Sequence, residues 1–183
     1  MNLAYVHEKI EDIKADCIMA TVRSNKYSQT KVNWVIRQLS GNYYHEQVEE
    51  ALTGRPIYMG DGDVCIARHD DEDRPRRFGM FTDVIFVIDD LFLPLRDIVA
   101  NGLLHANDSG HESIILPTPR TEMAFDMAEK SVLVKQMIAG VSKFRRQRPH
   151  TRRCLNNVML VELSGDTELI QLLKNGAYNF HRR

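Results

Sequence analysis

The chain has 183 residues, of which 43% are hydrophobic and 27% charged, and its formal net charge at pH 7 is -1. This length supports a core of its own, and the near-zero charge excludes strong long-range attraction to nucleic acid or anionic lipid. The three cysteines lack the spacing of a zinc site, which favours buried thiols in a reducing compartment and no metal or other cofactor. With neither a secretory leader nor an apolar run of about 20 residues, we expect a soluble, cytoplasmic protein that has no membrane partner.

Strand-like and helix-like segments alternate through the first part of the chain. The apolar run Cys17–Val22 predicts a strand that is buried on both faces. Residues 31–52 repeat apolar side chains at helical spacing with a break near Gly41, which predicts one or two helices. Short strands are expected next at Ile57–Met59 and Val64–Ala67, around a turn that contains two glycines.

The same alternation continues to the end of the chain. Further strands are predicted at Asp83–Ile88, Ser113–Leu116 and Asn157–Leu163, and helices at Leu95–Ala106, Ala128–Phe144 and Asp166–Lys174. This order predicts an α/β fold of three layers, α/β/α, with a mixed, mostly parallel sheet of about six strands. We expect a single domain over residues 1–183, with a polar tail from about residue 178.

Four short segments carry a resemblance to a known family. Residues 11–19, with Glu-Asp-Ile and Ala-Asp-Cys-Ile-Met, are similar to a Gly-Asp-Ile and Val-Asp-Ala-Ile-Val opening, and residues 53–57 to a Thr-Gly-x-Ala strand start. Residues 83–88 stand where that family has a Val-Ile-His strand, and residues 110–117 resemble its Ser-Ile-Ala-Phe-Pro strand and second loop. In this order and spacing the segments resemble the macro domain. The resemblance implies the macro-domain fold and an ADP-ribose-like ligand.

The two phosphate-binding loops of that family are altered in this chain. Residues 20–23 read Ala-Thr-Val-Arg in place of the family's Asn-Ala-Ala-Asn, and residues 24–31 contain no glycine. Residues 120–125 also lack the glycines of the family's second loop. Glycine lets backbone N–H groups approach a pyrophosphate closely, so these changes predict a ligand site unlike the usual one.

The resemblance assigns ligand-binding roles to residues beside the first strand. It implies that Asp12 accepts a hydrogen bond from the adenine amino group and that the backbone of Ile13 lies beside the base, although Asp12 would equally cap a turn. Arg23 replaces the family's distal-ribose asparagine at the strand end, where ligands of open α/β sheets bind. With Lys26 it would hold phosphate by charge, and Asn25 would restore the missing amide. The alternative is a solvated basic loop.

The second altered loop supplies the remaining candidates, Thr118, Arg120, Thr121, Glu122 and Phe125. An arginine beside a threonine near a helix start is a candidate anion clamp. An aromatic ring in this loop would stack on a ribose or base, or pack within the loop. The glutamate is a candidate general base, without a recognisable partner in the sequence.

Three functions follow from this resemblance. The first is a divergent macro-type module that binds ADP-ribose, a related nucleotide derivative or an ADP-ribosylated macromolecule. The second is an ADP-ribosyl hydrolase or an ADP-ribose-phosphate phosphatase, although the loops of that chemistry are largely missing. The third is a macro scaffold repurposed for protein or nucleic-acid binding, because Lys143–Arg153 has six basic residues among eleven and would make a weak polyanion contact.

Overall fold

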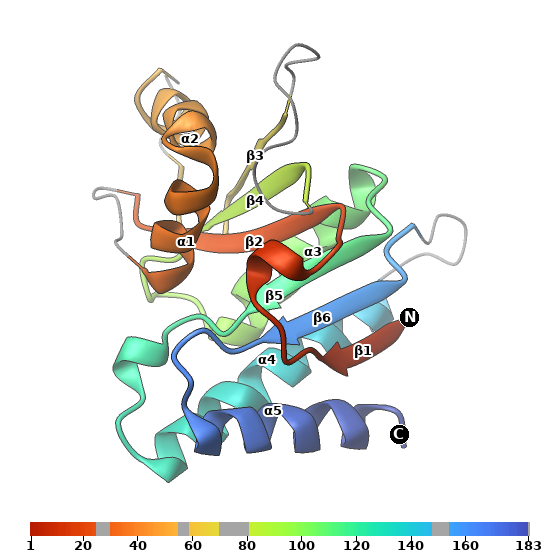
Figure 1. Cartoon of the computed structure of the whole chain (residues 1–183). Helices are drawn as coiled ribbons and strands as arrows, with labels where there is room; N and C mark the ends of the chain where they lie inside the picture. The colour runs from red at the N-terminus through yellow and green to blue at the C-terminus, as the bar shows by residue number, and fades with distance from the viewer. Residues whose placement is uncertain (25–29, 55–58, 70–80, 148–153, 183) are drawn as a thin grey trace.

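The structure is a computed structural model that describes residues 1–24, 30–54, 59–69, 81–147 and 154–182. A six-stranded sheet forms the centre of the molecule (Figure 1). The strands are β1 (Asn2–Tyr5), β2 (Cys17–Val22), β3 (Val64–Ala67), β4 (Asp83–Ile88), β5 (Ser113–Pro117) and β6 (Asn157–Val161). Their spatial order is β1-β6-β5-β2-β4-β3. The edge strand β3 runs antiparallel to β4, and the other neighbouring pairs are parallel. The predicted mixed, mostly parallel sheet is confirmed.

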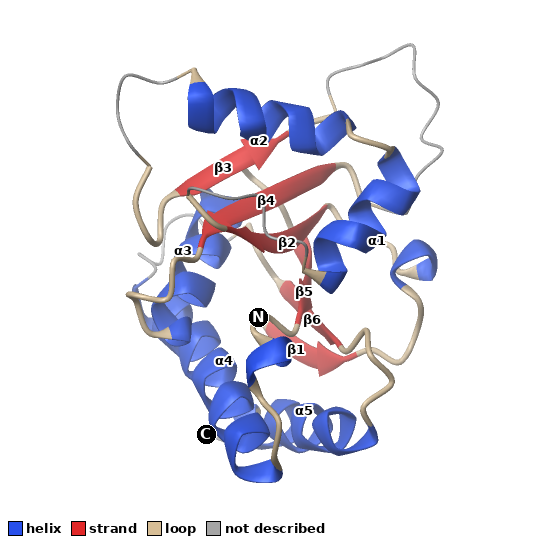
Figure 2. Cartoon of the chain, turned by 90° about the vertical axis from the view of Figure 1, so that its left-hand side faces the viewer, coloured by secondary structure: helices blue, strands red, loops and turns tan. Residues whose placement is uncertain are grey.

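Helices cover both faces of this sheet (Figure 2). They are α1 (Lys31–Ser40), α2 (Tyr43–Thr53), α3 (Leu95–Asp108), α4 (Met127–Gln147) and α5 (Thr167–Phe180), with short 3-10 turns η1 (Ile10–Asp12) and η2 (Thr121–Met123). The predicted break between the first two helices is confirmed. It lies at Gly41, whose φ of 61° favours glycine.

The burial of β2 shows why its residues form an apolar run. Its alternate side chains point to opposite faces, so Cys17 and Met19 join the core under α3, α4 and α5. Ile18 and Ala20 join the second core, under α1 and α2. Because both faces of the strand are covered, every residue from Cys17 to Val22 is buried.

The two ends of the chain differ from the prediction. Strand β1 was not predicted, because only Leu3 among its four residues is fully buried and the alternation is too short to recognise. Its pairing with β6 identifies it as a strand. The prediction of a polar tail from residue 178 is wrong for residues 178–180. Helix α5 continues to Phe180, which is only 6% exposed because it packs into the core.

The other predicted helices and strands agree with the structure within a few residues. The predicted strand Ile57–Met59 is not tested, because residues 57 and 58 lie outside the described part of the chain. In the part that is described, each helix is too short or too polar to cross a membrane. The parallel strands β2, β4, β5 and β6 all end at the same edge of the sheet. This carboxyl-terminal edge is where open α/β sheets bind ligands.

Candidate ligand-binding cleft

A cleft of about 440 Å³ opens at the carboxyl-terminal edge of the sheet, between the start of α1, the η2 loop and the start of α5. We call it the main cleft, and the residues around it are Thr30, Lys31, Thr121, Glu122, Ala124, Lys130, Ser164, Asp166 and Leu169. Small-molecule sites typically enclose about 300–1,000 Å³. The main cleft is therefore large enough for a small ligand.

The start of α1 forms the electropositive wall of the main cleft. Thr30 caps this helix, since its Oγ1 accepts a hydrogen bond from the backbone N–H of Asn33 at 3.3 Å. The first turn contains no acidic residue, and Lys31 at its beginning is exposed. The unpaired N–H groups and the dipole of a helix start attract anions, and Lys31 adds a full positive charge. This wall favours a negatively charged ligand.

The opposite wall is held together by Lys130, whose ion pairs with Asp166 and Glu168 join α4 to the start of α5. Its Nζ lies 2.7 Å from an Asp166 carboxylate oxygen and 2.9 Å from a Glu168 oxygen. Hydrogen bonds to Asp166 and then Glu168 raise the pKa of Lys130, and the bond from Lys130 lowers the pKa of Asp166. Lys130 is thus a charged structural tie in the cleft wall, and its amine is not available as a nucleophile.

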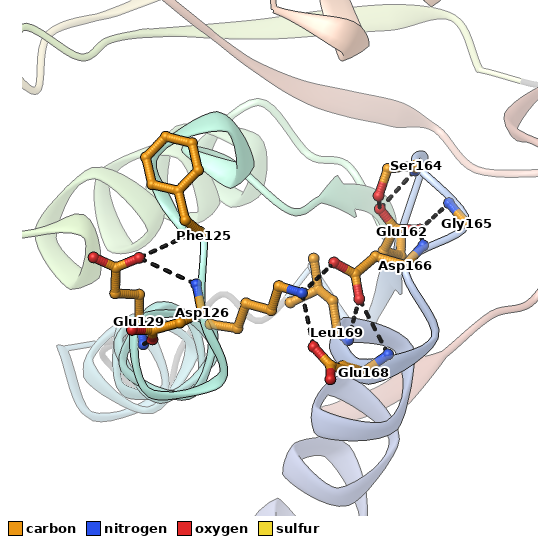
Figure 3. A network of polar contacts seen from close by, with 10 residues as sticks. Phe125, Asp126, Glu129, Glu162, Ser164, Gly165, Asp166, Glu168 and Leu169 are labelled. Carbon is orange, nitrogen blue, oxygen red and sulfur yellow. Dashed lines mark hydrogen bonds and ion pairs between the residues drawn. The ribbon is translucent and has the colours of Figure 1, made fainter.

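The turn between β6 and α5 contains an anion cradle that the chain fills itself. The Glu162 carboxylate accepts the backbone N–H groups of Ser164 at 2.6 Å, Gly165 at 2.6 Å and Asp166 at 3.1 Å, and also the Ser164 hydroxyl (Figure 3). Successive backbone N–H groups in a turn commonly bind phosphate or carboxylate. Because Glu162 occupies them, α1 rather than this turn is the candidate anion-binding side of the main cleft.

A second cleft of about 350 Å³ lies on the other side of the same turn. The residues around it are Tyr5, Val6, His7, Glu8, Lys9, Ile10, Glu11, Val35, Glu162, Leu163, Gly165 and Ile170. The rings of Tyr5 and His7 lie with their centroids 6.2 Å apart, and Val35 and Ile170 add apolar surface. Aromatic and apolar walls of this kind suit a flat ring, so the second cleft differs in chemistry from the main cleft.

The structure brings several predicted site residues together beside the main cleft. Thr121 and Glu122 line the main cleft itself. Thr118 and Arg120 surround, with these two residues, an adjoining space of about 20 Å³. Half-buried Arg23 shares a space of about 10 Å³ with Arg120 and Glu122 at the end of β2. The end of β2 and the altered second loop therefore meet at this edge of the sheet.

Arg120 has a protein partner that the sequence did not reveal. Its Nε and Nη2 donate to the two carboxylate oxygens of Asp89 at 2.9 and 2.6 Å, and Nη2 also donates to the Leu93 carbonyl at 3.0 Å. Asp89 follows β4 and is only 4% exposed. The anion-clamp hypothesis predicted that this guanidinium binds a ligand, whereas in the structure two of its nitrogens donate hydrogen bonds to Asp89.

Other candidates lie away from the main cleft. Asp12 is exposed at the end of η1, next in sequence to Glu11 of the second cleft, and its backbone N–H closes a turn by donating to the Lys9 carbonyl. Ile13 is 3% exposed, and its N–H donates to the Ile10 carbonyl at 3.2 Å. The ring of Phe125 is 84% exposed. Asn25 and Lys26 lie outside the described residues.

Four residues around the main cleft were not predicted as site residues: Thr30, Lys31, Lys130 and Ser164. Thr30 before an apolar helix repeat is a recognisable cap, and Ser164 stands in a turn before a helix. Each pattern predicts a helix start, but not that the two starts face one cleft. Lys130 gives no local signal, because its partners lie 36 and 38 residues further on.

Two further expectations are the absence of a metal site and a weak polyanion contact through Lys143–Arg153. Within the described ranges, no group of three or more His, Cys, Asp or Glu side chains is arranged to hold a metal ion. In the basic segment, Lys143 pairs with Asp97 at 2.9 Å and the Arg145 guanidinium lies 5.7 Å from the centroid of the Phe180 ring. Residues 148–153 of that segment lie outside the described part.

Comparisons with known proteins identify the fold. No protein-family model matches the chain, and no curated protein is similar in sequence. Among solved structures, the Trypanosoma brucei macrodomain in complex with ADP is 12% identical with a TM-score of 0.68, the match covering 96% of this chain and 68% of that one.

Two further structures support the same assignment. The macro domain of ganglioside induced differentiation associated protein 2 is 11% identical with a TM-score of 0.67, over 96% of this chain and 84% of its own. A mutant Oceanobacillus iheyensis macrodomain with ADPR is 12% identical with a TM-score of 0.64, and the match covers 99% of this chain and 93% of that one. The chain has the macrodomain fold, with a sequence that is only 11–12% identical to these proteins.

Proposed function

We propose that this chain is a divergent macro-type module that binds ADP-ribose or a related nucleotide derivative at the carboxyl-terminal edge of its sheet. The observation that carries the proposal is the main cleft, whose α1 wall offers a capped helix start and an exposed lysine without an acidic residue in the first turn. Two of the similar structures are described with ADP or ADPR, ligands that contain a diphosphate. A diphosphate is the type of anion that this wall attracts.

The arrangement of the two clefts suggests how such a ligand would lie. The diphosphate would sit at the start of α1, near Lys31 and opposite the self-filled turn of Glu162. The base would then enter the second cleft, where Tyr5, His7 and Ile170 provide aromatic and apolar walls. In this pose Asp12, exposed beside the second cleft, keeps its proposed role as an acceptor for the adenine amino group.

Calorimetric titration with ADP and ADP-ribose tests the proposal, using a Lys31→Glu variant. We expect saturable binding by the wild type, and a loss of affinity of about tenfold in the variant, because it places a negative charge on the anion wall. An acidic residue in the first turn also favours the helix, so the loss cannot be ascribed to unfolding.

The matched control is Lys135→Glu, which makes the same charge change at an exposed position of α4 away from both clefts. Its affinity should equal that of the wild type. If the wild type binds neither nucleotide, the proposed function is refuted. If both variants lose affinity equally, the effect is one of overall charge and not of the α1 wall.

A further inference from the structure

Arg120 is held in one conformation by three hydrogen bonds and an unusual backbone. Its φ of 57° and ψ of 24° lie in the left-handed region, which non-glycine residues seldom adopt. The guanidinium binds both oxygens of Asp89 and the carbonyl of Leu93. Paired, planar hydrogen bonds of this type are among the strongest that side chains make. The side chain is therefore fixed over the end of β4.

The partner segment is also fixed. The Asp61 carboxylate accepts the backbone N–H groups of Asp90, at 2.6 Å, and of Leu93. Asp90 in turn accepts the backbone N–H of Ser24 at 2.9 Å. Since Asp89 lies in the middle of these contacts, neither side of the Arg120–Asp89 pair can move aside without breaking several hydrogen bonds.

The available space changes sharply at this ion pair. The main cleft encloses about 440 Å³ between α1, η2 and α5. Toward β4, where Arg120 forms part of the wall, the two adjoining spaces that its side chain borders enclose about 20 and 10 Å³. A sugar ring requires far more room than these spaces offer.

We infer that the Arg120–Asp89 pair closes the β4 end of the cleft, so that the site selects nucleotides that end at their phosphate over nucleotides that carry a further sugar. This inference rests on the proposed function. With the base in the second cleft and the diphosphate at α1, the group attached beyond the diphosphate would meet Arg120 and Asp89. The pair acts as a specificity-determining block, because it rejects the longer ligand by steric conflict.

ADP and ADP-ribose differ by this terminal ribose, so their relative affinities for the wild-type protein test the inference directly. By calorimetric titration we expect ADP to bind at least about tenfold more tightly than ADP-ribose. If ADP-ribose binds as tightly as ADP, the inference is overturned and the proposed function stands. If neither binds, the proposed function fails and the inference fails with it.

The double variant Asp89→Asn with Arg120→Gly tests whether the pair is the cause. Glycine suits the positive φ, and asparagine avoids leaving an unpaired charge at a buried position. We expect affinity for ADP-ribose to rise about tenfold, while affinity for ADP changes by less than about threefold. A folded double variant that keeps the wild-type preference contradicts the inference.

The matched control is Asp97→Asn with Lys143→Ala, which removes another ion pair, away from the clefts. It should leave the ratio of the two affinities unchanged. Circular dichroism checks that each variant folds. If the double variant does not fold, the single variant Arg120→Lys replaces it. Lysine keeps a positive charge near Asp89, but it cannot form the paired hydrogen bonds and it occupies less space. It should narrow the preference for ADP, and an unaltered preference contradicts the inference.

Discussion

The two edges of the central sheet use similar polar residues in opposite ways. At the amino-terminal edge, Asp16 accepts the backbone N–H groups of Glu112 at 2.7 Å and Ser113 at 2.8 Å. At the same edge His111 lies 2.8 Å from Asp83. These groups join strands to one another. At the carboxyl-terminal edge the corresponding segments surround the two clefts.

Polar residues near strand ends therefore do not by themselves indicate a ligand site. At the amino-terminal edge their hydrogen bonds are directed to neighbouring backbone, whereas the start of α1 presents its charge to an open cleft. The Arg120–Asp89 pair is an intermediate case, since it lies at the carboxyl-terminal edge but its hydrogen bonds are made within the protein. Substitutions at the first edge should therefore change stability, and substitutions at the second should change binding.

The largest effect is expected for Asp16→Ala. It removes two charge-assisted hydrogen bonds and leaves the backbone N–H groups of Glu112 and Ser113 without this acceptor. We expect the free energy of unfolding in urea to fall by about 3 kcal/mol, with ADP affinity unchanged. Glu112→Ala is the control, because its side chain is exposed and its backbone donor remains. A loss below about 1 kcal/mol would show that this edge is not held by Asp16.

A smaller effect, dependent on pH, is expected at His111. Its Nδ1 lies 3.0 Å from the Ala106 carbonyl and its Nε2 lies 2.8 Å from Asp83, so both ring nitrogens face acceptors and the imidazolium form satisfies both. The hydrogen bond to Asp83 is the main cause that raises the pKa of His111. Its stabilising contribution is complete below the unfolded pKa of about 6.5 and is lost as pH rises through the higher folded pKa.

Urea titrations between pH 6 and pH 9 measure this effect. At pH 6 we expect His111→Gln to lower the free energy of unfolding by about 2 kcal/mol, and the difference from the wild type to shrink at higher pH. His105→Gln, at an exposed position of α3, should retain the wild-type pH profile. A constant difference across the range would mean that the pair does not titrate.

Asp12→Ala examines the ligand edge without disturbing the fold. Asp12 is exposed, so the free energy of unfolding should change by less than about 0.5 kcal/mol. Loss of the adenine acceptor should weaken ADP binding by about tenfold in calorimetry. Lys14→Ala is an exposed neighbouring control that should have no effect on binding. If the wild type and Asp12→Ala bind ADP with equal affinity, Asp12 does not contact the ligand and serves only in the turn.

The smallest effect is expected for Phe125→Ala. The ring is 84% exposed and follows Ala124, which lines the main cleft. We expect no measurable change in thermal stability and a loss of ADP affinity of about threefold, from lost stacking. Phe92→Ala removes an equally exposed ring, at 85%, from the loop before α3 and serves as the control. If both substitutions weaken binding alike, the effect is not specific to Phe125.

Much of the fold was predictable from local patterns. The run Cys17–Val22 is apolar throughout because both faces of its strand are buried, and the periodic residues after Lys31 mark an amphipathic helix. Strand β1 was missed because four residues, with one fully buried, carry too little pattern. The end of α5 was missed because the residues after Lys174 are mostly polar, and among those that belong to the helix only Ala177 and Phe180 are buried in the core.

The candidate site was predictable only in part. The sequence placed Arg23, Thr118, Thr121 and Glu122 in loops at strand ends, and the structure brings these residues to one edge. It gave no reason to connect Lys130 with Asp166, because contacts between helices depend on how each helix packs on the sheet. The same holds for Thr30 and Ser164, which come together only after folding.

The alternating α/β pattern and the absence of glycine from residues 24–31 and 120–125 can be read from the sequence, because each is written in neighbouring residues. Which side chains meet at the carboxyl-terminal edge is set by the tertiary structure. Asp89 and Arg120 follow β4 and β5, and they meet because both strands flank β2 and end at the same edge. That order depends on the packing of the whole sheet, which no local pattern specifies.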